Sequence, residues 1–240
     1  MTSNTVIEEA FTELASHYEE TMDRELASFL GSSYSEFVDG LIALACVKDG
    51  DVVLDVATGT AHFPRKLAAK MGDKCRIVGL DITPAMLEYG RKKVKRLAGP
   101  ARISLVCASG MAMPFGEGVF DIIVCGMGTH HMDVPRMLAE MRRVLKAGGR
   151  LTMVDVGASA LWRSLWGAAL LRILLVCYGV AQKSARAQAE IEAFANIRTA
   201  DEWRNLLADA GFSKIEVSET RARRFWYPHV LTMTAMAGGY

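Results

Sequence analysis

The chain has 240 residues, enough for one sizeable α/β domain with its own core, and its length gives no reason to divide it. Lys and Arg together number 28 and Asp and Glu 27, so the formal net charge is only +1. This balance argues against a dedicated nucleic-acid surface, which needs clustered positive charge, and favours a small-molecule partner. The five cysteines form no CxxC pair, which favours reduced core residues of a cytoplasmic protein over a disulfide framework or a metal site.

Helices are predicted before the first strand, over residues 5–47. Phe11, Leu14 and Tyr18 recur at near-helical spacing, and a second apolar pattern covers residues 37–46. This segment is expected to cover part of the core as an N-terminal helical cap. The opening residues lack both a basic start and an apolar core, so no signal peptide is expected.

Residues 51–63, with the sequence DVVLDVATGTAHF, predict a buried strand, a short loop and the start of a helix. Gly59 in the loop has no side chain, and the first N–H groups of a helix near Pro64 would point outward without partners. The loop can therefore approach a ligand closely, in the way that glycine loops approach nucleotides.

A second strand over residues 76–80 ends at Asp81, which lies 22 residues after Gly59. A βαβ unit places a carboxylate at this distance, where it accepts hydrogen bonds from ribose hydroxyls. The next helix begins at Thr83 and Pro84 and ends in the basic run RKKVKR, which indicates a solvated helix end rather than a nucleic-acid patch.

Strands and helices continue to alternate along the chain. Further strands are predicted at 103–107, 120–125 and 150–156, with a helix over 135–145 that Gly148 and Gly149 would stop. Five strand and helix alternations followed by two final strands, at 214–219 and 230–235, indicate a doubly wound, mostly parallel seven-stranded α/β sheet. Ligands of such sheets bind beyond the carboxyl ends of the strands, so Gly59, Asp81, Ser109 and Gly126 are expected to converge there.

The alternation is interrupted by an apolar stretch at residues 160–181. Arg163 and Arg172 break it, so no uncharged run reaches the length of about 18 residues that a spanning helix needs. A helical lid over the site is favoured. The alternative is a peripheral membrane contact, which the two arginines weaken because they fall on opposite helical faces. The chain then divides into a cap (1–47), a core (48–157), a lid insertion (158–198) and a C-terminal helix with two strands (199–240), in a single domain (1–240).

Four motifs at matching separations resemble the class I S-adenosylmethionine-dependent methyltransferases. They are VLDVATGTA (53–61), GLDIT (79–83), MPFGEGVFDIIVC (113–125) and VLKAGGRL (144–151). The resemblance covers roughly residues 45–220 and is closest to the ubiquinone/menaquinone C-methyltransferase-like group. It implies a Rossmann-like methyltransferase fold, S-adenosyl-L-methionine as cofactor and a methyl-transfer activity.

The resemblance also implies which residues bind the cofactor. The glycine loop would lie under the methionyl part, Asp81 would bind both ribose hydroxyls and Ile82 would pack on the adenine. Residues 109–111 would edge the adenine ring, and residues 126–127 would pass near the sulfonium. The complete expected set is Asp55, Ala57, Thr58, Gly59, Thr60, Asp81, Ile82, Met86, Ser109, Gly110, Met111, Gly126 and Met127.

Two positions depart from the family pattern. Ala61 replaces the last glycine of the loop and adds a methyl group where close approach is usual. Ser109 replaces an aspartate that accepts a hydrogen bond from the adenine amino group, and an uncharged acceptor makes a weaker contact. Both changes are expected to weaken cofactor binding. An NAD-type interpretation fails because the loop lacks the later glycine of that fingerprint.

Methyl transfer needs alignment of two reactants and the exclusion of water, and a base only if the acceptor carries a proton. His131, His130 and Tyr18 are the candidate catalytic residues, with His131 favoured. The alternative is that one histidine caps a turn, the other packs, and Tyr18 belongs to the core.

The apolar insertion favours a hydrophobic acceptor of the quinone, polyketide, terpenoid or lipid type. Two other functions stay open. One is a cyclase that uses the same cofactor without methyl transfer. The other is a membrane- or partner-binding module built around residues 161–180 and the run RARRFWY at 221–227. The sequence leaves the oligomeric state open.

Overall fold

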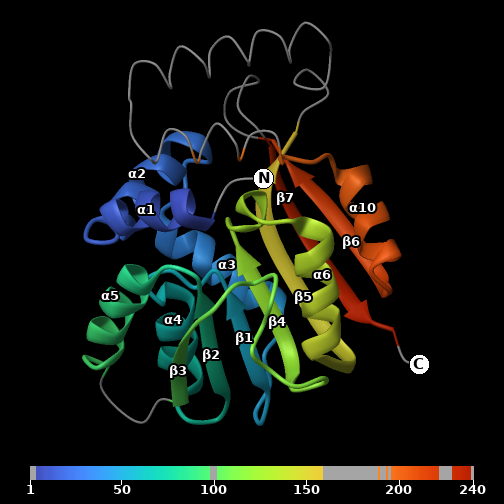
Figure 1. The fold of residues 1–240 in the computed structure, drawn as a ribbon, viewed down its shortest axis with the longest axis horizontal. Helices are drawn as coiled ribbons and strands as arrows, with labels where there is room; N and C mark the ends of the chain where they lie inside the picture. The colour runs from blue at the N-terminus through green and yellow to red at the C-terminus, as the bar shows by residue number, and fades with distance from the viewer. Residues whose placement is uncertain are drawn as a thin grey trace, which may run out of the picture.

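The centre of the computed structural model is one seven-stranded sheet of order β3-β2-β1-β4-β5-β7-β6 (Figure 1). The structure describes residues 4–97, 102–158, 196–221 and 229–238, together with Ala189 and Ala193. Strands β1 to β5 run parallel, and β7 is antiparallel to both β5 and β6, which confirms the predicted doubly wound sheet. The strands are β1 (Val52–Val56), β2 (Arg76–Asp81), β3 (Arg102–Cys107), β4 (Phe120–Gly126), β5 (Leu145–Gly157), β6 (Phe212–Thr220) and β7 (His229–Ala237).

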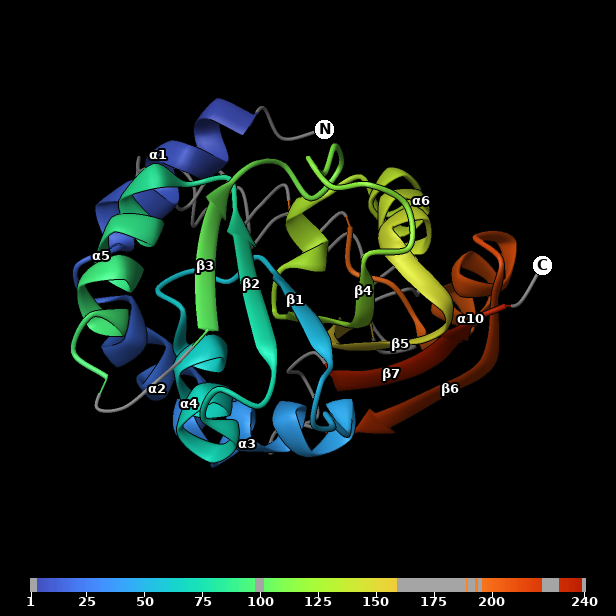
Figure 2. The same cartoon turned by 90° about the horizontal axis from the view of Figure 1, so that it is seen from below.

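Helices cover both faces of the sheet, and two of them lie above its carboxyl edge. Figures 1 and 2 show α3 and α4 on one face, α6 and α10 on the other, and α1 and α2 above the ends of the strands. The helices are α1 (Asn4–Leu14), α2 (Tyr18–Phe29), α3 (Tyr34–Ala45), α4 (His62–Met71), α5 (Pro84–Val94), α6 (Val134–Val144) and α10 (Ala200–Asp209).

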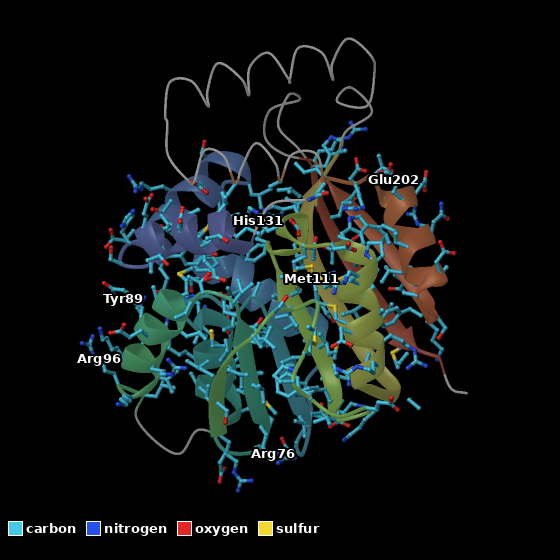
Figure 3. The ribbon with its side chains drawn as sticks, in the orientation of Figure 1. Arg76, Tyr89, Arg96, Met111, His131 and Glu202 are labelled. Carbon is cyan, nitrogen blue, oxygen red and sulfur yellow. The ribbon has the colours of Figure 1, made fainter. Side chains whose placement is uncertain are left out.

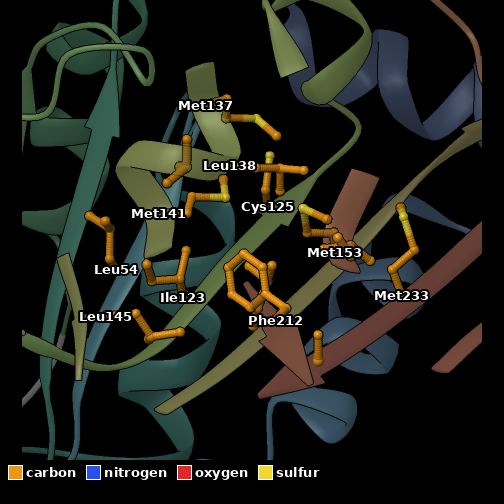
Figure 4. Packing of buried hydrophobic residues seen from close by; sticks show 14 of the residues in the cluster. Leu54, Ile123, Cys125, Met137, Leu138, Met141, Leu145, Met153, Phe212 and Met233 are labelled. Atoms are coloured by element: carbon orange, nitrogen blue, oxygen red, sulfur yellow. The ribbon is translucent and has the colours of Figure 1, made fainter. Parts of the chain in front are cut away.

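Successive residues of β1 pack into two different cores. Leu54 belongs to the cluster beneath α6 and α10, whereas Val53 belongs to the cluster beneath α3 and α4. Figure 4 shows the first cluster, in which Met141 of α6 lies above the strand residue Ile123. Because both faces are covered, every residue of β1 is buried and all but Asp55 are apolar, without the alternation of a half-exposed strand, which is why the sequence indicates a buried parallel strand.

Helix α6 ends at Val144, within one residue of its predicted end, but β5 begins earlier than its sequence predicts. The strand was expected from residue 150, whereas it already begins at Leu145 and includes Gly148 and Gly149. Leu145 pairs with Phe120, and the next pair joins Arg150 to Ile122, so the glycines lie in an irregular section of the strand. A glycine within a strand commonly marks such a bulge, and here Gly148 has a φ of 71°.

The predicted lid and the aromatic run are largely outside the described residues. The lid spans 158–198, of which the structure describes Ala158, Ala189, Ala193 and residues 196–198. Of the run at 221–227 it describes only Arg221. Within the described parts of the chain, no helix is long and apolar enough to cross a membrane.

The packing of Gly79 beneath the glycine loop generates a prediction about stability. A Cβ at Gly79 would lie 2.7 Å from the Thr58 hydroxyl and 2.8 Å from a Leu105 methyl group. We expect Gly79→Ala to lower the free energy of unfolding by about 1–3 kcal/mol, because the packed neighbours must shift. Urea unfolding measures this change.

The matched control is Gly40→Ala in α3, where a Cβ would meet nothing within 4 Å. The same substitution there should raise the free energy of unfolding by up to about 1 kcal/mol, because alanine loses less conformational entropy than glycine when a helix forms. Equal effects at the two positions would contradict the packing described for Gly79.

Candidate active site

A pocket lies at the carboxyl ends of β1, β2 and β4, under the N-terminal helices. Figure 3 shows His131 at this upper end of the sheet, with Arg76 at the opposite end. The strands thus bring together residues that are far apart in sequence, as the predicted topology requires. The wall of the pocket is made by Ile7, Phe11, Tyr18, Ala57, Gly59, Leu80, Asp81, Ile82, Thr83, Met86, Ser109, Gly110, Met111, Gly126, Met127, Gly128, His131 and Met132.

The glycine loop turns sharply from β1 into α4. Ala57, Gly59 and Ala61 have φ angles of 59°, 55° and 60°, so every second residue lies in the left-handed region. A Cβ at Gly59 would lie 3.4 Å from the Met86 Cε and 3.5 Å from a ring carbon of Tyr18. Gly59 therefore supplies both the backbone angle and the narrow space that a ligand-binding loop needs.

The structure corrects the expectation for Ala61. Its side chain is wholly buried and does not line the pocket. The methyl group points at α5, 3.3 Å from where a Cβ on Gly90 would stand. Ala61 is also the N-cap of α4, which therefore begins at His62 rather than near Pro64. Alanine in place of the usual glycine therefore strains the backbone and contacts α5. Its methyl group takes no space from a ligand.

Asp81 connects the loops that follow β1 and β2. Its Oδ2 accepts a hydrogen bond from the Gly59 N–H at 2.8 Å, and its Oδ1 accepts one from the Thr83 N–H at 2.9 Å. Burial raises the pKa of this carboxyl, while hydrogen bonds from the backbone of Thr83, Gly59 and Ile82 and from the Thr83 side chain act in the opposite direction. The carboxylate lies on the pocket wall, where its oxygens are hydrogen-bond acceptors.

Asp55, Thr58 and Thr60 shape the loop without lining the pocket. The Thr58 hydroxyl donates to Asp55 Oδ2 at 2.5 Å, and the Thr58 N–H donates to the Leu80 carbonyl. Burial raises the pKa of Asp55 to about 7. These three residues were expected to contact the cofactor, but their polar groups bond to the protein. Thr58 bonds to Asp55 beneath the loop, and the Thr60 hydroxyl donates to Glu19 of α2.

The loop after β3 is held by its own side chains. The Ser109 hydroxyl accepts a hydrogen bond from the Met111 N–H at 3.2 Å, and the Met111 sulfur accepts one from the Asp133 N–H at 3.2 Å. Ser109, Gly110 and Met111 all line the pocket, as expected. Gly126 and Met127, which follow β4, lie on the same wall.

His131 borders the pocket, and its Nδ1 atom is buried without a hydrogen-bond partner among the described residues. The Phe11 ring packs edge-on against the imidazole, with 5.3 Å between the ring centroids. Burial, together with the neighbouring His130, lowers the pKa of His131 to about 3. The imidazole is therefore neutral near pH 7 and offers one nitrogen as a hydrogen-bond acceptor and one as a donor.

His130 does not line the pocket but pairs with Asp155 of β5. Its Nδ1 lies 2.6 Å from Asp155 Oδ1, and Asp155 itself is only 1% exposed. Asp155 Oδ2 also accepts hydrogen bonds from the Thr129 N–H and hydroxyl. Burial opposes the ionisation of Asp155, but His130 and Thr129 outweigh it and lower the pKa of the carboxyl. The pair anchors the segment that carries His131.

Tyr18 lies on the pocket wall, where it covers Gly59. Its ring packs edge-on against Tyr34, with 6.1 Å between centroids. Burial raises the pKa of the Tyr18 phenol above its usual range, so the hydroxyl stays protonated near pH 7. Tyr18 can donate a hydrogen bond but is not suited to act as a base.

Several residues of the site were not predicted. Asp155 is separated from His130 by 25 positions, and only the pairing of β4 with β5 brings them together. The signal that could have found it is an acid within the apolar strand 151–156. The wall residues that the sequence did not predict are Ile7, Phe11, Leu80, Thr83, Gly128 and Met132.

Solved structures with the same fold include methyltransferases. A SAM-dependent methyltransferase from Aquifex aeolicus superposes with a TM-score of 0.62 at 18% identity, covering 93% of this chain and 98% of that one. Phosphoethanolamine N-methyltransferase 2 from Haemonchus contortus, in complex with S-adenosyl-L-methionine, superposes with a TM-score of 0.68 at 14% identity, covering 95% and 60%. At such low sequence identity, these superpositions show that the fold is shared and no more.

Sequence relatives are closer. A ubiquinone/menaquinone biosynthesis C-methyltransferase from Geotalea uraniireducens is 29% identical over 88% of this chain and 89% of its own. One from Geobacter sp. strain M21 is 31% identical over 68% and 71%. The model of the ubiE/COQ5 methyltransferase family matches residues 1–222. The chain therefore belongs to the ubiE/COQ5 methyltransferase family.

Proposed function

We propose that this S-adenosylmethionine-dependent methyltransferase acts on an apolar small molecule with a quinone-type ring. The observation that carries the proposal is the composition of the pocket wall beside the glycine loop. Ile7, Phe11, Met111 and Met132 make this wall apolar, and His131 is a neutral polar group within it. The relatives named for ubiquinone and menaquinone biosynthesis support an acceptor of this class.

The residues of the pocket fit the cofactor. Asp81 presents a carboxylate that can accept hydrogen bonds from hydroxyl groups, and Gly59, Ile82 and Met86 line the same wall. When bound, S-adenosylmethionine supplies a methyl group on a positively charged sulfur. In this proposal Asp81 holds the ribose, Ile82 and Met86 contact the adenosine part, and the backbone of Gly126 and Met127 faces the reacting end.

The histidines have different roles in this proposal. His131 orients the acceptor, because a neutral buried imidazole can accept a hydrogen bond from a ring hydroxyl at Nδ1. Its pKa of about 3 makes it a weak base, so alignment is its contribution rather than proton removal. His130 and Asp155 act through His131 by fixing its segment, and are therefore positioning residues.

Binding of S-adenosylhomocysteine tests the role of Asp81. We expect Asp81→Asn to weaken binding by about ten- to hundredfold, because hydrogen bonds to a charged group contribute about 1.5–3 kcal/mol. Isothermal titration calorimetry measures the dissociation constant. Asp121→Asn is the control, since Asp121 pairs with Lys146 at the start of β4, away from the pocket. Tight binding by Asp81→Asn would remove Asp81 from the site.

A radiolabelled methyl-transfer assay tests the acceptor class. We expect the wild-type protein to methylate a prenylated hydroquinone and to leave phosphoethanolamine unmodified, because the wall, as far as the structure describes it, offers no cluster of basic groups for a phosphate. His131→Phe should lower turnover about fivefold, the effect of one neutral hydrogen bond, without changing cofactor affinity. His131→Asn, which keeps a polar group, is the matched control. Methylation of phosphoethanolamine alone would overturn the proposed acceptor.

The low pKa of His131 also predicts a pH dependence of stability. The unfolded imidazole has a pKa of 6.5 and the folded one a pKa of about 3, so between these values the unfolded chain binds one more proton. Stability from this group is complete above pH 6.5 and falls as the pH falls towards 3. His131→Phe should reduce the slope by about 1.4 kcal/mol per pH unit, measured by urea unfolding between about pH 4 and 6. An unchanged slope would show that His131 titrates normally.

A further inference from the structure

We infer that Glu19, at the start of α2, is a positioning residue that holds the N-terminal helices over the pocket and couples them to the glycine loop. The inference rests on the proposed cofactor site. Glu19 is absent from the pocket wall, so its effect must pass through its neighbours.

One carboxylate oxygen of Glu19 joins three parts of the cofactor-binding core. Glu19 Oε1 accepts hydrogen bonds from the Thr60 hydroxyl at 2.6 Å and from Arg65 Nη2 at 2.6 Å, and it lies 2.8 Å from Lys93 Nζ. Thr60 belongs to the glycine loop, Arg65 to α4 and Lys93 to α5. A single side chain of α2 thus contacts the loop and both helices that flank it.

These contacts differ from an ordinary surface ion pair. The Glu19 side chain is 24% exposed, and those of Arg65 and Lys93 are 21% and 31% exposed. The exposed pair Glu88 and Lys92 on α5 has values of 63% and 58%. Water screens the partly buried network less, and its members support one another geometrically.

The pKa of Glu19 is consistent with a charged carboxylate at the centre of this network. Burial acts to raise the pKa of Glu19, but hydrogen bonds from His62, Lys93 and Thr60 and the charge of Arg65 outweigh it. The pKa is held below its usual range, and the carboxyl stays charged near pH 7.

Glu19 and the residue before it in α2 contact neighbouring residues of the glycine loop. Tyr18 covers Gly59, and the next residue, Glu19, binds Thr60. Two consecutive residues of α2 therefore rest on two consecutive residues of the loop. The preceding helix α1 packs on α5 and carries Ile7 and Phe11 into the pocket wall.

This arrangement links closure of the cap to the shape of the loop. Ile7, Phe11 and Tyr18 make part of the wall. Release of bound S-adenosylhomocysteine therefore requires the N-terminal helices to move from their observed position. Moving them separates Glu19 from Thr60, Arg65 and Lys93. The network therefore sets how long the pocket stays closed, and the same bonds hold Thr60 in the loop.

The variant Glu19→Gln tests the inference, because it keeps the size of the side chain and removes its charge. We expect the dissociation rate of S-adenosylhomocysteine to rise about tenfold, the Michaelis constant for the cofactor to rise in parallel, and turnover at saturation to change less than twofold. Stopped-flow displacement measures the rate. Hydrogen exchange should become faster in residues 4–29.

Asp39→Asn is the matched control. Asp39 of α3 pairs with Lys66 and Lys70, so it joins a cap helix to α4 through ion pairs that are more exposed and do not include the loop. This variant should leave the dissociation rate unchanged. Lys93→Met is a second variant of the network, for the case in which Glu19→Gln fails to fold, and it should also accelerate dissociation.

The outcomes separate the two proposals. If the wild-type protein does not bind S-adenosylhomocysteine, the proposed cofactor site fails. If the wild-type protein binds and Glu19→Gln or Lys93→Met releases the ligand at the wild-type rate, the inference about Glu19 fails and the cofactor site stands. If Asp39→Asn accelerates release as much as Glu19→Gln does, the effect is general loosening of the cap and the inference is also overturned.

Discussion

The two hydrogen bonds that Asp81 accepts from the backbone are the constraint on which the site depends. A buried carboxylate is costly unless its oxygens are hydrogen-bonded, and here Gly59 and Thr83 supply the donors. Because Gly59 follows β1 and Thr83 follows β2, the carboxylate joins the loops of two neighbouring strands. The wall of the pocket is built outward from this junction, with Ile82 beside it and Tyr18 of the cap above Gly59.

Local conformational preferences are violated where the ligand loop is formed. Ala57 and Ala61 adopt left-handed φ angles that alanine rarely takes, and Gly79 leaves just enough space for Thr58. Strain of this kind persists only where surrounding contacts overdetermine the backbone. The Thr58 bond to Asp55 beneath the loop and the Glu19 bond to Thr60 on its other side provide such contacts. The strained loop is thus held by the core and by the cap together.

Adjacent histidines acquire different properties from their surroundings. His130 turns towards Asp155 of β5 and forms a buried pair, whereas His131 faces the pocket beside Phe11 and remains neutral. The two rings lie only 4.3 Å apart between centroids. Nothing in the dipeptide distinguishes them. The difference arises because a turn of 3₁₀-helix over Thr129–His131 sends the two side chains to different partners.

The sequence by itself determined the sheet, the glycine loop, the acid at the end of β2 and the family, because these depend on local patterns and on separations along one chain. Apolar runs define the strands, and their alternation with helices defines the topology. Only the tertiary structure decided that Ala61 points away from the pocket, that Asp55 lies beneath the loop, and that Glu19 and Asp155 hold the site. Each of these depends on the direction of a side chain and on a partner distant in sequence, which spacing alone does not specify.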